Sequence, residues 1–406
     1  MKHNWKRDMA ALLVLALLIP LCFSCGAGKE EGKLTITIGE ITDLTGPGSP
    51  ATIPLHYVMQ DLVKYYNEKG LIPGVKLRLV SYDDQYNLAR DIPGYEWCRE
   101  RGAKVILAIF AGTAETLKPF AERDKVPVVT VSTSQPLLSS PGWVFSITSP
   151  FADQARVLLK WISENHWDYT KGTPKVGSVG WTSPAATDLA KTIKEYCQAN
   201  PDKFEWGGGF LVPVGTMGFA GEIEKLKDCD YIMPYATPTA YFGREFRNKG
   251  YGATFLGDSS AASFLGFFAD SIGWKGLDGF LSTQTCRWWD EQYPIVELAK
   301  ELLQTYHAGK AEKMIHAGSS YVGGVTNFSA FLDIVRGAIE EVGAEQFDGQ
   351  AFYDTAIDFK VQYDGFPEWY FTETERSLIH DAAVYEWRAQ TEDLVRVSDW
   401  LPFTTD

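Results

Sequence analysis

Short apolar runs alternate with amphipathic stretches along most of this chain, from Leu34 onward. Runs such as Lys104–Ile109 are typical of buried strands, whereas Thr52–Lys69 repeats its apolar residues with a helical period. A strand, then a helix, then another strand predicts parallel pairing, because parallel neighbours need a crossover connection. The sequence therefore predicts an α/β protein whose parallel sheets are covered by helices.

The alternation falls into two series, each of which predicts one sheet. The first series has helices between strands that we expect at residues 34–41, 75–82, 104–109 and 126–131. The second begins with a helix at 153–167 and predicts strands at residues 175–181, 204–212, 230–234 and 253–256. A chain of 406 residues also exceeds what one hydrophobic core usually supports. We therefore expect two α/β domains.

The last third of the chain does not repeat this pattern. Residues 293–307 and 319–342 are strongly helical, whereas residues 357–397 alternate aromatic, apolar and charged residues as antiparallel strands do. A tail of that length cannot bury a core of its own. We therefore expect it to return to the two sheets, so that the chain crosses between the domains more than once.

The N-terminal segment has the three parts of an export signal. Basic residues open it, an apolar stretch spans Met9–Leu21, and small residues surround Cys25. The stretch is too short for a convincing membrane-spanning helix. We expect residues 1–24 to be a signal peptide, Cys25 to carry lipid, and residues 25–33 to form a flexible tether. An ordinary secretion signal and an apolar first helix are the alternatives, because Cys22 and Phe23 depart from the usual lipoprotein pattern.

Charge and cysteine content exclude several classes of protein. The net charge is -14 and no basic cluster relieves it, which argues against nucleic acid as a partner. Four cysteines follow the signal, and none forms a CxxC pair or lies near a histidine at zinc-ligand spacing, so we expect no metal site and no cofactor. A disulfide between Cys197 and Cys229 and unpaired buried thiols are the two alternatives for these cysteines.

Several segments, taken in their order along the chain, carry a resemblance to a known family. They are TITIGEITDLTGPGS at residues 35–49, YYNEKGLIPGVKLRLVSYDDQYNLARD at 65–91, and KVILAIFAGTAETLKPFAE at 104–122 followed by VPVVTVSTSQP. Together they resemble the periplasmic solute-binding proteins of branched-chain amino acid uptake systems, which have the type I periplasmic binding fold. The likeness extends, more weakly, to residues 230–285.

The resemblance implies two Rossmann-like lobes with parallel sheets, three interdomain crossovers and a ligand trapped between the lobes. The crossovers would lie near Ser149, near Thr283 and within residues 353–379. Lobe 1 would then comprise residues 34–149 with 285–350, and lobe 2 residues 150–284 with 351–406.

In lobe 1, the resemblance places two groups of residues at the ligand. Ala111, Gly112 and Thr113 follow a buried strand and precede the helix that we expect at residues 114–123, so their N–H groups and the Thr113 hydroxyl could face an anionic ligand group. The alternative for Thr113 is a simple N-cap. Ser132 and Ser134 end the next strand and are expected to contact the ligand, or else to form an ordinary turn.

In lobe 2, four side chains are candidates for ligand contact. Tyr235 ends a strand and corresponds to a family tyrosine that lines the cleft, although a core position is its alternative. Asp258 lies beside the family position that holds a ligand ammonium. Trp181 could stack over the ligand or pack within the lobe, and Ser183 could hydrogen-bond to the ligand.

The function that follows is capture of a small solute. We find no nucleophile elbow, zinc-protease helix or dinucleotide loop, so we expect no enzyme activity. The resemblance implies a lipid-anchored, monomeric binding protein of an ABC importer in the periplasm or on the outer face of the cytoplasmic membrane. It would close on an amino acid-like, amide or aromatic acid ligand and deliver it to an ABC permease. A sensory module of the same fold and a secreted hydrolase using Asp84 or His56 are the alternatives; we interpret the Asp83–Asp84 pair as structural or as part of the cleft rim.

Overall fold

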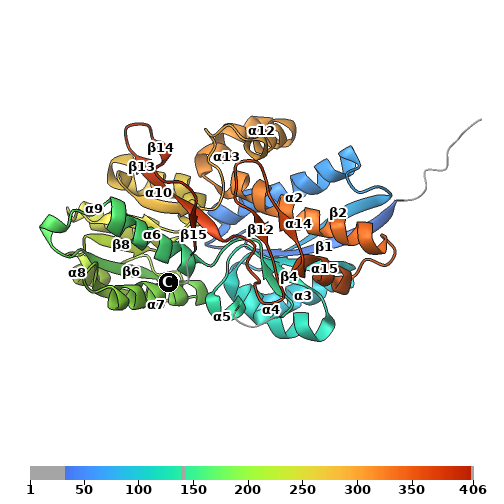
Figure 1. The fold of residues 1–406 in the computed structure, drawn as a ribbon, viewed down its shortest axis with the longest axis horizontal. Helices are drawn as coiled ribbons and strands as arrows, with labels where there is room; N and C mark the ends of the chain where they lie inside the picture. The colour runs from blue at the N-terminus through green and yellow to red at the C-terminus, as the bar shows by residue number, and fades with distance from the viewer. Residues whose placement is uncertain (1–32, 139–141, 404–406) are drawn as a thin grey trace, which may run out of the picture.

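The computed structural model describes residues 33–138 and 142–403. Cys25, the expected signal peptide and residues 25–32 of the tether therefore lie outside the described residues. Figure 1 shows two layered α/β bodies side by side along the long axis of the molecule. In the part of the chain that the structure describes, no helix is both long and apolar enough to span a bilayer.

The first sheet has five strands, all parallel, in the order β2-β1-β3-β4-β5. The strands are β1 (Leu34–Thr42), β2 (Val75–Asp83), β3 (Ala103–Ala108), β4 (Val128–Thr130) and β5 (Val144–Ser146). The helical segments that connect them are α2 (Ser49–Lys69), η1 (Leu88–Arg90), α3 (Asp91–Glu100), α4 (Ala111–Asp124) and α5 (Gln135–Leu138). The predicted parallel sheet is confirmed, with β5 as an additional edge strand.

The second sheet has the order β14-β13-β10-β9-β8-β6-β7, with β15 paired to β13. Strands β6 to β10 are parallel: β6 (Lys175–Trp181), β7 (Glu205–Val212), β8 (Tyr231–Pro234), β9 (Thr254–Gly257) and β10 (Leu281–Gln284). The C-terminal strands are antiparallel: β13 (Asp381–Arg388), β14 (Asp393–Arg396) and β15 (Leu401–Pro402). The tail therefore returns to a sheet that is already built, as expected.

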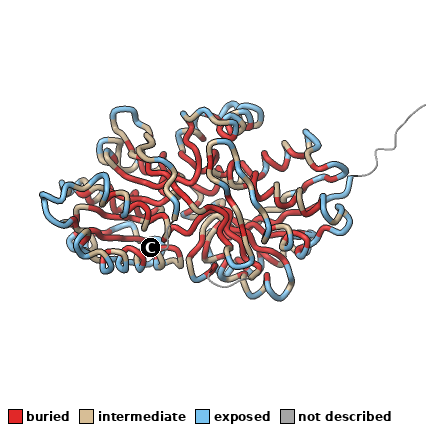
Figure 2. Tube along the Cα trace, in the orientation of Figure 1, coloured by how far each residue is buried: buried red, intermediate tan, exposed pale blue. Residues whose placement is uncertain are grey.

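The helices of this second body surround its sheet. They are α6 (Phe151–Asn165), η2 (Tyr169–Lys171), α7 (Pro184–Ala199), α8 (Ala220–Leu226), α9 (Pro238–Asn248), η3 (Ala261–Phe264), α10 (Leu265–Ile272) and α11 (Trp274–Leu277). Figure 2 shows burial concentrated along the strands and where the two bodies meet.

The segment between β10 and β13 returns to the first sheet. It contains α12 (Pro294–His307), η4 (Ala308–Lys310), α13 (Ala311–Ala317), α14 (Ser320–Val342), α15 (Gly349–Ile357) and the hairpin of β11 (Lys360–Val361) and β12 (Trp369–Tyr370). Helix α14 packs on α2, and at Gly324 a Cβ atom would lie only 3.0 Å from Leu55 Cδ2. Glycine lets the two helices approach this closely.

The chain passes between the two bodies three times. It leaves the first sheet after β5, returns to it after β10, and leaves it again before β13. The first and last passages lie side by side, because the Ser146 N–H donates to the Arg376 carbonyl oxygen at 2.8 Å. The three crossovers agree with the expected fold class. Helix α15, which the predicted boundaries assign to lobe 2, contacts α14 and β3.

All four described cysteines are buried free thiols, so the Cys197–Cys229 disulfide is wrong and the unpaired alternative is correct. The two residues belong to different hydrophobic clusters. Burial raises the pKa of the Cys197 thiol to about 12 and that of Cys229 to about 11. These thiols serve as small apolar side chains.

Candidate functional site

A cavity of about 130 Å³ lies between the two sheets, at the carboxyl ends of their strands. Residues that follow β1, β2, β3 and β4 line one side, and residues that follow β6, β8 and β9 line the other. Open parallel sheets bind ligands at this edge. A cavity of about 150 Å³ accommodates benzene in another protein, so this one has room for a ligand of about one ring.

Four of the predicted site residues line this cavity: Ser132, Trp181, Ser183 and Tyr235. The Trp181 indole N–H donates to the Thr216 carbonyl oxygen at 2.9 Å, which fixes the ring in the wall. Ser183 caps α7, because its hydroxyl oxygen accepts a hydrogen bond from the Ala186 N–H at 3.2 Å. Burial raises the pKa of Tyr235 well above its usual value, so this residue is a neutral hydroxyl.

The residues Ala111, Gly112 and Thr113 do not line the cavity. The expected helix start at residue 114 was wrong by one turn, since α4 begins at Ala111 and includes all three residues. The Thr113 hydroxyl lies 3.4 Å from carboxylate oxygens of Asp84 and Asp91, so it faces the interior of lobe 1. Ligand contact by these three residues has no support from this geometry and stays a prediction.

Ser134 and Asp258 also lie behind the wall of the cavity. The Ser134 hydroxyl donates to Glu115 at 2.8 Å. The Asp258 carboxylate accepts a hydrogen bond from the Ser260 N–H at 2.8 Å, and burial raises its pKa to about 6. Their predicted contacts with a ligand therefore stay predictions.

Sequence reasoning missed most of the wall. From lobe 1 it missed Thr52, Tyr86 and Phe110, and from the strand β10 it missed Gln284. It also missed the start of α14, where Ser319, Ser320, Gly323, Gly324 and Asn327 line the cavity. Ser319, Ser320, Gly323 and Gly324 are four small residues near the start of a helix. Such a cluster indicates that another group approaches the helix closely, so the sequence alone could have pointed to these residues.

The two lobes contact each other across the mouth of the cavity. The Gln135 N–H, after β4, donates to the Asp188 carboxylate of α7 at 2.7 Å. The Thr237 hydroxyl donates to the Pro47 carbonyl oxygen at 3.2 Å. Ala111 also packs with Phe151 and Ala185 of the opposite lobe. The structure is therefore a closed arrangement of the lobes.

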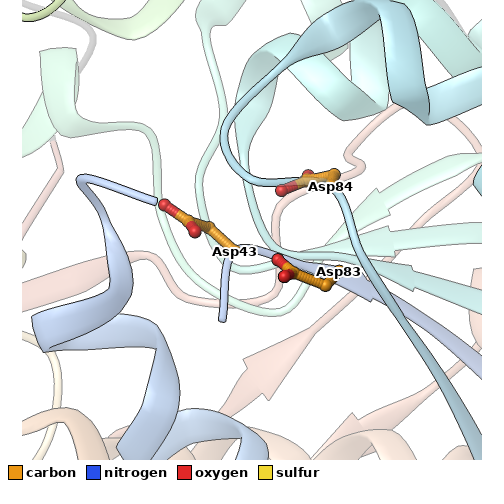
Figure 3. A group of neighbouring side chains, drawn as sticks. All are labelled: Asp43, Asp83 and Asp84. Carbon is orange, nitrogen blue, oxygen red and sulfur yellow. The ribbon is translucent and has the colours of Figure 1, made fainter. Parts of the chain in front are cut away.

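Three acidic side chains form a group where β1 and β2 end, as Figure 3 shows for Asp43, Asp83 and Asp84. Each has a carboxylate oxygen within 4.8 Å of those of the others. The carboxylates accept hydrogen bonds from the loop: Asp43 from the Gly48 N–H at 2.7 Å, Asp83 from the Leu44 N–H at 2.9 Å, and Asp84 from the Tyr86 N–H at 2.9 Å. Two of these bonds, to Gly48 and Tyr86, connect the group to residues that line the cavity.

Burial changes the acidity of this rim. It raises the pKa of Asp84 to about 6 and that of the neighbouring Asp91 to about 7. The negative charges of Asp43 and Asp84 act with burial to raise the pKa of Tyr86 to about 12. No described histidine lines the cavity, and the Nδ1 atom of His56 lies 2.6 Å from the Glu40 carboxylate. The polar side chains among the described lining residues can hold a ligand through hydrogen bonds.

Comparison with known proteins gives one family match. A family model described as periplasmic binding protein matches residues 35–392. A search of the curated proteins finds no match to this chain.

Solved structures share the fold over nearly the whole chain. A branched chain amino acid ABC transporter from Thermus thermophilus with bound valine is 22% identical, with a TM-score of 0.80 over 91% of this chain and 97% of that one. A fatty acid ABC transporter substrate-binding protein from Thermomonospora curvata is 16% identical, with a TM-score of 0.77 over 91% and 92%. An ABC transporter solute binding protein from R. palustris in complex with 4-hydroxybenzoate is 18% identical, with a TM-score of 0.75 over 91% and 97%. At these identities the likeness concerns the fold.

Proposed function

Because the chain belongs to the periplasmic binding protein family, we propose that it captures a small organic solute between its lobes and delivers it to an ABC permease. The observation that carries this proposal is the cavity itself, which is lined from both lobes at the carboxyl ends of their strands. The ligands bound in two of the similar structures, valine and 4-hydroxybenzoate, are small organic molecules of the same general size. We also propose that the protein acts as a monomer outside the cytoplasm, where lipid on Cys25 holds it near its permease.

Capture proceeds by closure of the lobes. Ligand contacts on both lobes favour the closed state over the open one. The equilibrium between the two states shifts by the difference in the ligand's affinity for them. The three crossovers are the segments about which the lobes move. Aromatic side chains of both lobes, among them Phe110 and Trp181, would cover the apolar part of the ligand, and hydroxyl and amide groups would hold its polar part.

A thermal-shift screen tests this function. The purified protein is heated with amino acids, amides and aromatic acids, and we expect at least one compound to raise the Tm in proportion to its concentration. Tyr235→Ala and the milder Ser132→Ala should reduce that rise, because both residues line the cavity. Tyr169→Ala, at an exposed tyrosine outside the cavity, is the control and should keep it. No response to any compound would contradict the proposal.

A further inference from the structure

The cavity wall carries no full charge. Among the residues that the structure describes, those lining the cavity include no Asp, Glu, Lys, Arg or His. The polar side chains of the described wall are hydroxyls, two amides and the Cys286 thiol, and the other side chains are aromatic or aliphatic. A ligand with a net charge would lose its hydration on entering and find no ionic partner.

Three buried polar atoms of the wall have no partner within the described chain: Gln284 Oε1, Asn327 Oδ1 and Ser260 Oγ. Gln284 is only 1% exposed, and its amide nitrogen lies 3.5 Å from the Ser282 hydroxyl. Carbonyl oxygens of amides accept hydrogen bonds and cannot donate them. Because buried polar groups are normally paired, the two amide oxygens indicate a ligand group that donates hydrogen bonds, whereas the Ser260 hydroxyl could pair with either a donor or an acceptor.

Three acidic side chains accept hydrogen bonds from backbone N–H groups of the wall. Asp43 and Asp84 lie under the first lobe's loops, and Asp258 lies under the second's. A ligand carboxylate would therefore meet negative side chains behind the wall and no cation in it. The start of α4, where the family resemblance places a carboxylate, is covered by Phe151 and Ala185 through their contact with Ala111.

We propose that the ligand is uncharged and consists of an apolar body of about one ring with a head group that donates hydrogen bonds, of which a primary amide is the simplest. The head group pairs with Gln284 and Asn327, and the apolar body lies against the aromatic wall. This inference rests on the proposed function and narrows its ligand class.

Three compounds of nearly the same shape but different charge test whether the cavity prefers an uncharged ligand. Benzamide is neutral, benzoate is anionic and benzamidine is cationic at pH 7. Titration calorimetry with the purified protein should show benzamide binding at least about tenfold more tightly than either charged compound, because neither charge finds a partner in the wall. Isovaleramide and isovalerate repeat the comparison with an aliphatic body, in case the wall prefers that shape.

Two variants of Asn327 test whether the preference for a neutral ligand comes from the cavity wall. Asn327→Leu keeps the number and branching of the side-chain heavy atoms and should weaken binding of the neutral amide by about tenfold, because the head group loses a partner. Asn327→Asp introduces a carboxylate and should reverse the order, so that benzamidine binds more tightly than benzamide. Thr355→Val is the matched control, since Thr355 Oγ1 is also buried without a partner but lies outside the cavity.

The outcomes separate this inference from the proposed function. Binding of the neutral amides with the predicted response to the Asn327 variants supports both. Preferential binding of benzoate, isovalerate, benzamidine or a zwitterionic amino acid, weakened by Tyr235→Ala, overturns the uncharged ligand and leaves solute capture standing. Absence of binding by every compound, including the amino acids and aromatic acids of the wider screen, overturns both.

Discussion

At the scale of single residues, buried carboxyl groups beneath the rim make stability depend on pH. The Asp91 side chain is fully buried, one of its oxygen atoms has no partner, and burial raises its pKa to about 7. A raised pKa means that the folded state binds more protons than the unfolded state between about pH 4 and pH 7. The free energy of unfolding should therefore fall as the pH rises through this window.

Replacing Asp91 tests this pH dependence. Over about three pH units, the titration of Asp91 lowers the free energy of unfolding by at most about 4 kcal/mol. Asp91→Asn should remove most of that fall, and its stability relative to the unchanged protein should increase from pH 5 to pH 7.5. Urea unfolding at both pH values measures the effect, and Asp202→Asn at an exposed site is the control. If the free energy of unfolding changes equally with pH in Asp91→Asn and in the unchanged protein, Asp91 does not titrate in this way.

The residues at the cavity were partly predictable from local sequence. Ser132, Trp181 and Tyr235 could be placed because each ends or follows a strand, and strand ends of one sheet gather at one edge. The start of α4 was predicted three residues too late, because the helix begins after Phe110 and no side-chain cap marks that position.

At the scale of elements, one hydrogen bond joins α7 to the segment after β4 across the cleft. The Asp188 carboxylate accepts it from the Gln135 N–H at 2.7 Å. We expect Asp188→Asn to weaken the closed state by about 1 kcal/mol and hence ligand affinity by about fivefold, without changing the Tm of the ligand-free protein. Titration with a compound from the thermal-shift screen measures this, and Asp202→Asn in the same lobe is the control. An unchanged affinity would mean that this contact does not contribute to closure.

Most strands and helices could be predicted, because their apolar periods are local properties of the sequence. Strand β6 has the same bounds as the predicted strand, residues 175–181. Strand β5 was missed because Val144–Ser146 has only three residues, and it exists through pairing with β4 and the bridge from Ser146 to Ser377. Such long-range pairing leaves no periodic signal in the segment itself.

At the scale of the whole molecule, the two bodies and three crossovers agree with the family resemblance, whereas the full wall of the cavity could not be foreseen. Asn327 reaches the cavity from α14, nearly two hundred positions after Ser132, because α14 packs on α2. Only the folded arrangement brings these residues together. Local reasoning therefore finds the strand-end residues and misses those that a distant helix contributes.

The predicted anchor is also a property of the whole chain. Cys25→Ala should move the protein from the membrane fraction to the soluble fraction, because the lipid would lose its attachment site. Ligand affinity should stay the same, since the substitution changes none of the described residues that line the cavity. Fractionation followed by titration measures both. A variant that remains in the membrane fraction would contradict the lipid anchor, while leaving the cavity's role unaffected.

The most direct test of the account is a distance between the lobes. Spin labels at Ile92→Cys in α3 and Val214→Cys after β7 use two exposed sites, and the four described native cysteines are buried. Labels at Tyr169→Cys and Val214→Cys, both in the second body, are the control pair. We predict that a compound which raises the Tm shortens the distance between the lobes and leaves the control distance unchanged. A compound that stabilises the protein without changing the distance between the lobes would contradict ligand capture by closure.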